Sequence, residues 1–476
     1  MAHEDTQVTP LAGEERLVRG LGLKEATALN MIDMVGVGPF ITIPLILAAM
    51  AGPQAMLGWL VGALLALCDG LVWAQLGAAM PHAGGTYVFL REAYGPQRWG
   101  RLLSFLFIWQ MLFRAPLSMA SGLIGFADYA DYAMESFGWQ SLVAADGGRT
   151  LEHRLLAGGV GLFIVFLLYR RITTIGKISL YLWVVVFGTI AWIIFGGITH
   201  FNAAVVFDFP PGAFDFWQFA FYVGLGNAML VAIYDYLGYQ NVCYLGAEIR
   251  DPVRVIPRAI IISILAIAAL YFVMNLSLIS VIPWREALTS KYIVSTFMER
   301  LYGPLAGQIV TGLILVAAFA SVWSLMLGYS RIPYAAALDG GFFRLFARVH
   351  PTKQFPHISL LAVGAVTVAF SLLFKLREVI VGLMAIRILI EFVAQAVAIL
   401  VLQRKGMHFP FRMWLYPLPA LAAIGMWLWL FLATGWFILI GLGVLLLGLV
   451  VYLVRARVLG EFPFTPARAS NEKAKV

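Results

Sequence analysis

Long runs of apolar residues, separated by short polar segments, extend along almost the whole chain. Residues 34–68, 259–284, 301–330 and 413–454 contain no Asp, Glu, Lys or Arg. Each run exceeds the ~20 residues that cross a bilayer core. Because lipid offers the backbone no hydrogen-bond partners, spanning segments are helices or closed barrels, and these unbroken runs lack the short alternating pattern of barrel strands. The pattern predicts an all-α polytopic membrane protein.

Twelve transmembrane helices account for the apolar runs. Their predicted centres are Gly38, Leu65, Gln110, Phe163, Val186, Ala232, Ala269, Phe319, Ala365, Phe392, Met426 and Gly443. The 413–454 run is too long for one helix at 1.5 Å per residue, so the Thr434-Gly435 pair near its middle predicts a tight turn between two spans.

Two of these helices contain helix-breaking residues inside the span. The first is interrupted at 36–39 (Gly-Val-Gly-Pro) and the sixth at 234–238 (Tyr-Asp-Tyr-Leu-Gly). The interruptions are five spans apart, so they occupy equivalent positions if the first ten spans form two five-helix repeats. Paired interruptions of this kind point to the substrate site of a transporter.

The spans and repeats predict five parts of the chain. These are a cytoplasmic N-terminal tail (1–24), a first five-helix repeat (25–200), a second five-helix repeat (201–404), two additional C-terminal helices (405–456) and a cytoplasmic C-terminal tail (457–476).

Composition and charge support a membrane location. The chain is 61% hydrophobic and 12% charged, whereas a soluble domain is about 45–50% apolar and about 25% charged. Lys and Arg are concentrated in segments that lie inside when the N-terminus is cytoplasmic, as the positive-inside rule requires. The first 24 residues lack the short apolar core of a cleaved signal peptide. We therefore expect a multi-pass protein of the cell (inner) membrane with both termini in the cytoplasm.

Several classes of function are excluded by what the sequence does not contain. The net charge is +8, but no soluble domain or large basic cluster is present to bind nucleic acid. Cys68 and Cys243, the two cysteines, lie in apolar segments, so a disulfide framework is not expected. No nucleophile motif, phosphate-binding loop or metal-ligand cluster is found. We predict no enzymatic activity, no cofactor and no metal site, and we expect transport to be driven by an ion gradient, by exchange or by the substrate itself.

Four groups of motifs occur near predicted helix ends. They are 36–40 (GVGPF); 81–87 (PHAGGTY) with 94–95 (YG); 246–248 (GAE) with 251–252 (DP) and 256–259 (IPRA); and 330–331 (SR) through 339–340 (DG). In this order they resemble the permeases of the amino acid–polyamine–organocation (APC) superfamily, and the resemblance covers nearly the whole chain. It implies a five-plus-five inverted repeat with alternating access, in which the unwound parts of helices one and six hold an amino acid or amine.

The sequence departs from that family in helix five and in its acidic residues. Many members carry a lysine midway along helix five that serves proton coupling, but residues 184–191 contain none and Lys177 lies only at the helix start. The acids Asp33, Asp235 and Glu391 are closer to the pattern of the polyamine-type branch.

The interrupted helices supply the candidate binding groups. Glycine permits unusual backbone dihedrals and close approach of a ligand, and unwinding frees backbone N–H groups. A carboxylate could bind there, facing the positive end of the half-helix that starts after Pro39. The alternative is a kink that only serves packing. The predicted substrate-binding residues are Gly36, Val37, Gly38, Phe40, Tyr234, Asp235 and Gly238.

Four residues are candidates for ion coupling, with protons or with sodium: Asp33, Glu391, Ser321 and Ser324. An acid inside a span should face the protein interior or water, where a proton and a substrate ammonium group would compete for it. Asp33 could instead cap free amides, and the serines could simply bond across helices. Glu391 lies four residues after Arg387 and is expected to pair with it, whereas Arg114 needs a tertiary partner such as Asp69.

These features favour a secondary active transporter, a symporter or antiporter, that moves an amino acid or related amine through the lipid bilayer. A polyamine transporter is the nearest alternative. A channel is disfavoured because two equivalent broken helices in one chain indicate a central occluded site. A sensor that binds an amino acid without transporting it also remains open.

Overall fold

The chain was analysed as a computed structural model, which describes residues 17–136, 138, 141–142, 149–290, 292–373 and 384–464. These residues are mostly helical, and no β-strand occurs among them. Two isolated bridges pair Leu21 with Ile249 and Ala83 with Leu245. The all-α prediction is therefore confirmed for the described residues, while parts of the predicted tails 1–24 and 457–476 lie outside them.

The α-helices follow one another with short connections. They are α1 (Leu23–Met34), α2 (Gly38–Ile41), α3 (Ile43–Met50), α4 (Met56–Ala79), α5 (Thr86–Tyr94), α6 (Gly100–Ser136), α7 (Leu151–Leu168), α8 (Ile172–Thr199), α9 (Ala203–Val206), α10 (Phe219–Tyr236), α11 (Asn241–Tyr244), α12 (Pro252–Ile279), α13 (Trp284–Ala287), α14 (Ile293–Tyr302), α15 (Pro304–Tyr329), α16 (Arg331–Leu338), α17 (His357–Leu373), α19 (Gln395–Arg404), α20 (Leu418–Ala433) and α21 (Phe437–Leu459). Short 3-10 or π-helical segments are η2 (Pro53–Ala55), η3 (Gly95–Trp99), η4 (Gly246–Glu248), η5 (Arg344–Ala347) and η6 (Ile388–Ala394).

In the part of the chain that the structure describes, nine helices are long and apolar enough to cross a bilayer, and the bent α1–α3 segment makes a tenth. The protein is thus a multi-pass membrane protein. Two shorter apolar helices, α17 and α20, contain the predicted centres Ala365 and Met426. Every predicted centre falls within a helical segment, but the number of twelve spans stays a prediction, because α20 is short and the described part of α17 stops at Leu373, next to residues outside the described ranges.

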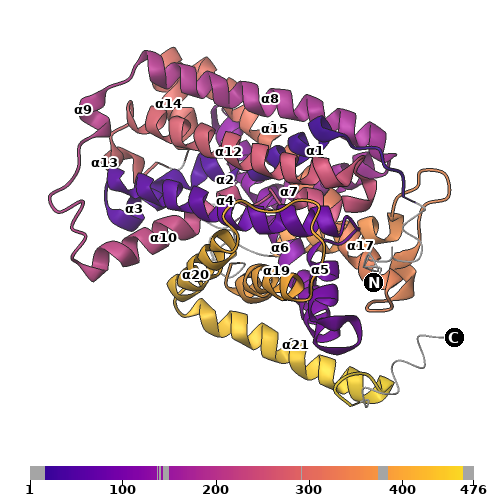
Figure 1. Ribbon diagram of the computed structural model, residues 1–476. Helices are drawn as coiled ribbons and strands as arrows, with labels where there is room; N and C mark the ends of the chain where they lie inside the picture. Colours follow the sequence, from indigo (N-terminus) through magenta and orange to yellow (C-terminus); the bar gives the residue numbers. More distant parts are fainter. Residues whose placement is uncertain are drawn as a thin grey trace.

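The two interrupted helices lie inside the bundle. α1 packs against α8, α12 and α15, and α10 packs against α3 and α4. Figure 1 shows α8 along one side of the molecule and the C-terminal helices α20 and α21 along the opposite side, with α1 and α12 between them. The last two helices are therefore peripheral, in keeping with their interpretation as additions to a central bundle.

Proline and glycine determine where the first span is interrupted and where it bends. Helical structure ends at Met34 and resumes at Gly38, so the interruption covers residues 35–37, which overlaps the predicted 36–39 but begins one residue and ends two residues earlier. The change of direction comes later: the axes of Leu23–Ile41 and Ile43–Met50 differ by 61°, and Thr42 is the residue between them. Pro44 cannot donate a backbone hydrogen bond to the preceding turn, which explains the bend at this position. The half-helix expected after Pro39 is therefore divided into the four-residue α2 and the separate α3.

The sixth span is interrupted slightly later than its sequence indicates. α10 continues through Tyr236, and residues 237–240 are non-helical before the four-residue α11. Tyr234 and Asp235 thus belong to the last turn of α10, and of the three predicted binding residues in this span only Gly238 lies in the interruption itself. The second half of this span is short, because α11 is followed directly by the 3-10 segment η4.

Candidate functional site

Gly36 and Gly38 bring the first interruption into direct contact with two other helices. A Cβ atom at position 36 would lie 2.9 Å from the Ser321 Oγ of α15, and one at position 38 would lie 2.1 Å from Asp235 Oδ1 of α10. Neither glycine has a positive φ. Close approach rather than an unusual dihedral therefore requires glycine here, which corrects one of the two reasons expected from the sequence.

The first interruption leaves a row of backbone donors free. Val35 N still donates to Met31 O, and Phe40 N donates to Val37 O. Between them, the N–H groups of Gly36, Val37 and Gly38 donate to no acceptor within the described ranges. Three neighbouring free donors are suited to bind the carboxylate of a ligand.

The second interruption depends on Gly238, whose φ is +138°. Its N–H donates to Gln240 Oε1 at 3.1 Å. A Cβ atom here would lie 2.6 Å from Met34 N, so the two interruptions are in van der Waals contact at this point. A side chain at position 238 would meet both an unfavourable φ and the backbone of the first span.

Asn30 of α1 holds the two interruptions together. Its Nδ2 donates to Tyr239 O at 2.7 Å, and its Oδ1 accepts from Val242 N at 2.9 Å. The side chain is completely buried. Sequence analysis missed this residue, although a polar amide one turn before a helix interruption is a usable signal.

A small cavity of about 60 Å³ lies between the two interruptions. Ser121 of α6, Tyr329 of α15 and Arg387, which precedes η6, also line it. The predicted site residues that line the cavity are Asp33, Gly36, Val37, Gly38, Tyr234, Asp235, Gly238 and Ser321. The remaining predicted residues are Phe40, Ser324 and Glu391, and these do not line it.

The two cavity-lining acids each present unpaired carboxylate oxygen. Asp235 Oδ2 accepts from Thr42 Oγ1 at 2.5 Å, at the bend of the first span, and Oδ1 has no hydrogen-bond partner among the described residues. The Asp33 carboxylate also has no hydrogen bond or ion pair within the described part of the chain, and Ser321 Oγ donates to the Asp33 backbone carbonyl instead. The acids can therefore accept hydrogen bonds from a cationic group in the cavity.

Glu391 is held by two arginines. Arg387 Nε and Nη2 donate to its two oxygens at 2.9 and 3.0 Å, as predicted for this pair. Arg114 Nη2 lies 3.2 Å from Oε2, and Tyr244 OH donates to Oε1 at 2.8 Å. The partner of Arg114 is thus Glu391 and not Asp69. Because its oxygens are already occupied, this geometry favours a structural role for Glu391, and its role in ion coupling stays a prediction.

The two predicted serines connect helix α15 to α1. Ser321 Oγ donates to Asp33 O at 3.1 Å, and Ser324 Oγ donates to Leu29 O at 2.7 Å. Both hydroxyl groups are thus engaged with backbone carbonyl groups of α1. The described residues contain no group of three or more His, Cys, Asp or Glu that could hold a metal. The contacts favour helix packing for both serines, and a coupling role is untested.

A buried ion pair connects the end of the sixth span to the first residue of α16. Arg331 Nε and Nη2 donate to the two oxygens of Glu248 at 2.7 and 2.8 Å, and both side chains are almost fully buried. The Glu248 carbonyl also accepts from Gly20 N and Leu21 N, just before α1. The segment that precedes the first span is thereby fixed to the end of the sixth.

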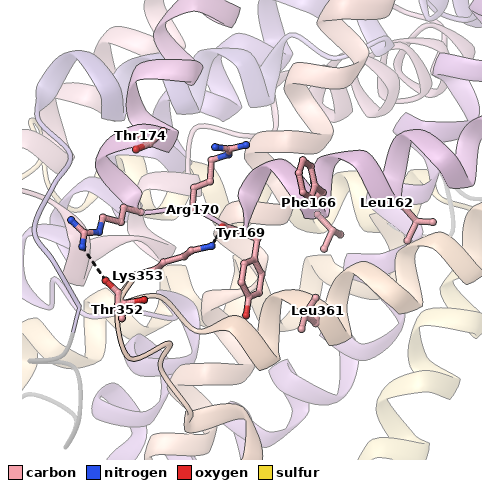
Figure 2. Close-up of a pocket in the computed structure, with 10 residues that line it drawn as sticks. Leu162, Phe166, Tyr169, Arg170, Thr174, Thr352, Lys353 and Leu361 are labelled. Atoms are coloured by element: carbon pink, nitrogen blue, oxygen red, sulfur yellow. Dashed lines mark hydrogen bonds between the residues drawn. The ribbon is translucent and has the colours of Figure 1, made fainter.

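A larger hollow, of about 730 Å³, lies on the surface between α7 and the segment that leads into α17 (Figure 2). Its apolar wall includes Leu162, Phe166 and Leu361, all exposed. Lys353 Nζ donates to Tyr169 O at 2.8 Å at its polar end. No residue of either interruption lines this hollow, so the small central cavity is the better candidate for the substrate site.

Comparison with known proteins gives consistent matches over most of the chain. The sequence profile of the family described as amino acid permease matches residues 21–460. The chain is 27% identical to the serine/threonine exchanger SteT of Bacillus subtilis (strain 168), over 86% of this chain and 90% of that protein. It is 26% identical to the branched-chain amino acid permease BcaP of the same organism, over 94% and 96%. It is 28% identical to human cationic amino acid transporter 4, over 82% of this chain and 60% of that protein. Because these names refer to different classes of amino acid, similarity alone does not select a substrate.

Proposed function

Because this chain belongs to the amino acid permease family, we propose that it is a secondary active transporter that carries an amino acid or a related amine across the membrane by alternating access. Members of this family are transporters and not enzymes. Transport is driven by protons or by exchange of one substrate molecule for another.

One observation carries the proposal. The free N–H groups of Gly36, Val37 and Gly38 adjoin the same small cavity as the unpaired carboxylate oxygens of Asp33 and Asp235. An α-amino acid is a zwitterion, whose carboxylate needs donors and whose ammonium group needs acceptors. The cavity supplies both sets, so a zwitterion satisfies groups that are otherwise buried without partners.

The size of the cavity favours a small side chain. A volume of about 60 Å³ accommodates about four to six water-sized groups, at ~10–15 Å³ for each. Alanine is of this size, and serine and threonine are only slightly larger; one of the similar proteins is named for the latter two. We propose a small neutral amino acid as the main substrate.

A cationic amino acid is the second candidate. Two carboxylates, Asp33 and Asp235, line the cavity beside one arginine, Arg387, which is also paired with Glu391, and one similar protein is named for cationic amino acids. A long cationic side chain would need a larger cavity than the one observed. A polyamine would leave the free amides of the first interruption without a partner.

The membrane arrangement follows the interpretation of the sequence. We propose twelve spans, with repeats at 25–200 and 201–404 followed by two additional helices at 405–456. The helical segments at all twelve predicted centres support this arrangement, as do the interruptions five spans apart. We propose that the protein lies in the cell membrane with both tails in the cytoplasm.

Counterflow in proteoliposomes tests the proposal. Vesicles that contain the purified protein are loaded with single amino acids, arginine, lysine or putrescine, and entry of the same labelled compound is followed. We expect exchange of small neutral amino acids. Exchange of only lysine and arginine would support the second candidate, exchange of only putrescine would support a polyamine transporter, and binding without any exchange would support a sensor.

Two acid substitutions then separate the classes of substrate. Asp33→Asn and Asp235→Asn each keep one oxygen that accepts a hydrogen bond from an ammonium group. We expect weakened but measurable exchange of neutral amino acids and loss of exchange for a dication. Asp251→Asn, at a surface position before α12, is the control and should behave as the unchanged protein.

A further inference from the structure

Among the described residues, one carboxylate buried near the middle of a membrane-spanning helix belongs neither to the cavity nor to an ion pair. Among the described residues, Glu248 and Glu391 are each paired with arginine, and Asp33 and Asp235 line the cavity. Asp69 lies near the middle of α4, is 1% exposed and makes no ion pair with any described residue. Its Oδ2 accepts a hydrogen bond from Tyr239 OH at 2.7 Å, and its Oδ1 has no partner.

No Lys or Arg of the described residues forms an ion pair with this carboxylate. The indole N–H groups of Trp73, on α4, and of Trp427, on α20, lie within weak hydrogen-bonding range of it, but they form no hydrogen bond of normal geometry with it or with another described residue. The charged side chain nearest to it in effect is Glu391, which is itself paired with Arg114 and Arg387. Cys68 precedes it on α4, and α12 faces the neighbouring Gly70 with isoleucine side chains.

The carboxylate is connected to the cavity through a single residue. Tyr239, which binds Asp69, directly follows Gly238 in the interruption of the sixth span. Gly238 contacts the backbone of Asp33 and Met34, and Asn30 holds the Tyr239 carbonyl. A change in the bond between Asp69 and Tyr239 therefore acts on the wall of the cavity.

We propose that Asp69 is the proton-binding site of this transporter and that Tyr239 transmits its occupancy to the interruption of the sixth span. The inference rests on the proposed transport function. A negative charge held inside a membrane helix without a cation is costly, and binding of one proton at Oδ1 removes that charge. No covalent bond other than O–H forms or breaks, and the proton returns to water on the opposite side of the membrane.

Protonation of Asp69 changes the hydrogen bond that connects it to Tyr239, in the interruption of the sixth span. Tyr239 donates to a charged acceptor when Asp69 is ionised and to a weaker, neutral acceptor when Asp69 is protonated. Because Asp69 is closed off from water in this conformation, the proton can enter or leave only when the surrounding helices move. Proton exchange is thereby tied to the conformational cycle.

The test measures proton entry and substrate entry in the same proteoliposomes, with an internal pH-sensitive dye and an acidic exterior. The substrate is an amino acid that the unchanged protein exchanges in counterflow. We expect the unchanged protein to take up protons with substrate. Asp69→Asn should lose proton entry and show the same substrate uptake with and without the pH gradient, but should keep counterflow. Asp251→Asn, which removes a carboxylate at the surface, is the matched control and should retain proton entry.

Two variants keep the test decisive if Asp69→Asn does not fold. Asp69→Glu retains a titratable group and should retain proton entry, whereas Tyr239→Phe should retain proton entry with a shifted external pH for half-maximal uptake. Wild-type proton entry in Asp69→Asn, or an unshifted pH profile in Tyr239→Phe, would overturn the inference. Substrate uptake by the unchanged protein without proton entry would also overturn it and leave the proposed function intact. Absence of counterflow for every compound would instead refute the proposed function, and this inference with it.

Discussion

The contact between Gly38 and Asp235 can be tested by adding one methyl group. In Gly38→Ala the new Cβ would lie 2.1 Å from Asp235 Oδ1, 3.2 Å from Cγ of the same side chain and 3.7 Å from Tyr234 Cε1. The backbone itself accepts alanine, because Gly38 has no positive φ and begins a helical turn. The perturbation is therefore purely steric and is directed at one cavity-lining carboxylate.

Two estimates of the magnitude agree. Overpacking of a closely packed interior costs ~1–3 kcal/mol. If Asp235 moves away instead, it loses the hydrogen bond from Thr42, and such bonds to a charged group contribute about 1.5–3 kcal/mol. If substrate binding requires Asp235 to return to its present position, this cost is taken from the binding free energy, and at ~1.4 kcal/mol for each factor of ten the substrate affinity should fall about 5- to 150-fold.

The half-saturation concentration for counterflow measures this change, alongside the thermal unfolding temperature of the purified protein. Gly425→Ala is the matched control, because a Cβ on this α20 glycine meets nothing within 4 Å. It should leave both quantities near their original values. If Gly38→Ala exchanged substrate with unchanged half-saturation, the placement of the substrate against Gly38 and Asp235 would be refuted.

Three further substitutions probe the contacts that support the cavity. In Asn30→Leu, the carbonyl of residue 239 and the N–H of residue 242 are buried without hydrogen-bond partners, and each unpaired group costs ~1–3 kcal/mol of stability. The protein should therefore unfold at a clearly lower temperature. An unchanged unfolding temperature would contradict the conclusion that Asn30 holds the two interruptions together. Glu248→Gln breaks a buried ion pair and should lower the free energy of unfolding by about 3–5 kcal/mol. The double variant Glu248→Leu with Arg331→Met replaces both charges and should recover much of that loss when thermal unfolding is measured. Tyr271→Phe removes the hydroxyl group that donates to Met34 O at 2.7 Å and to Asp235 O at 3.3 Å. We expect ~1–3 kcal/mol of lost stability and weaker substrate exchange. Exchange equal to that of the unchanged protein would show that these carbonyl groups do not shape the cavity.

Local sequence patterns predicted the elements well, because apolar length and helix-breaking residues act locally. The interruption near Gly36 and the pairing of Arg387 with Glu391 follow from spacing along one helix. The 61° bend at Thr42 was missed, although Pro44 was a local signal for it.

Contacts between helices could not be predicted in the same way. The helix that contains Arg114 offers it no acidic partner one turn away, and its actual partner, Glu391, is 277 positions later in the chain. The reason for glycine at position 38 depends on a carboxylate of α10 that only the packed structure brings close. The roles of the site residues remain predictions that the proposed experiments address.

The Asn30 amide has a consequence for the kinetics of transport. Since one side chain of the first span bonds to residue 239 inside the second interruption and to residue 242 just after it, the two unwound segments are expected to move as a single mechanical part. A substrate molecule that loosens one segment then loosens the other in the same step. Partly opened intermediates, with one segment released and the other still in place, should be too short-lived to leak ions across the membrane.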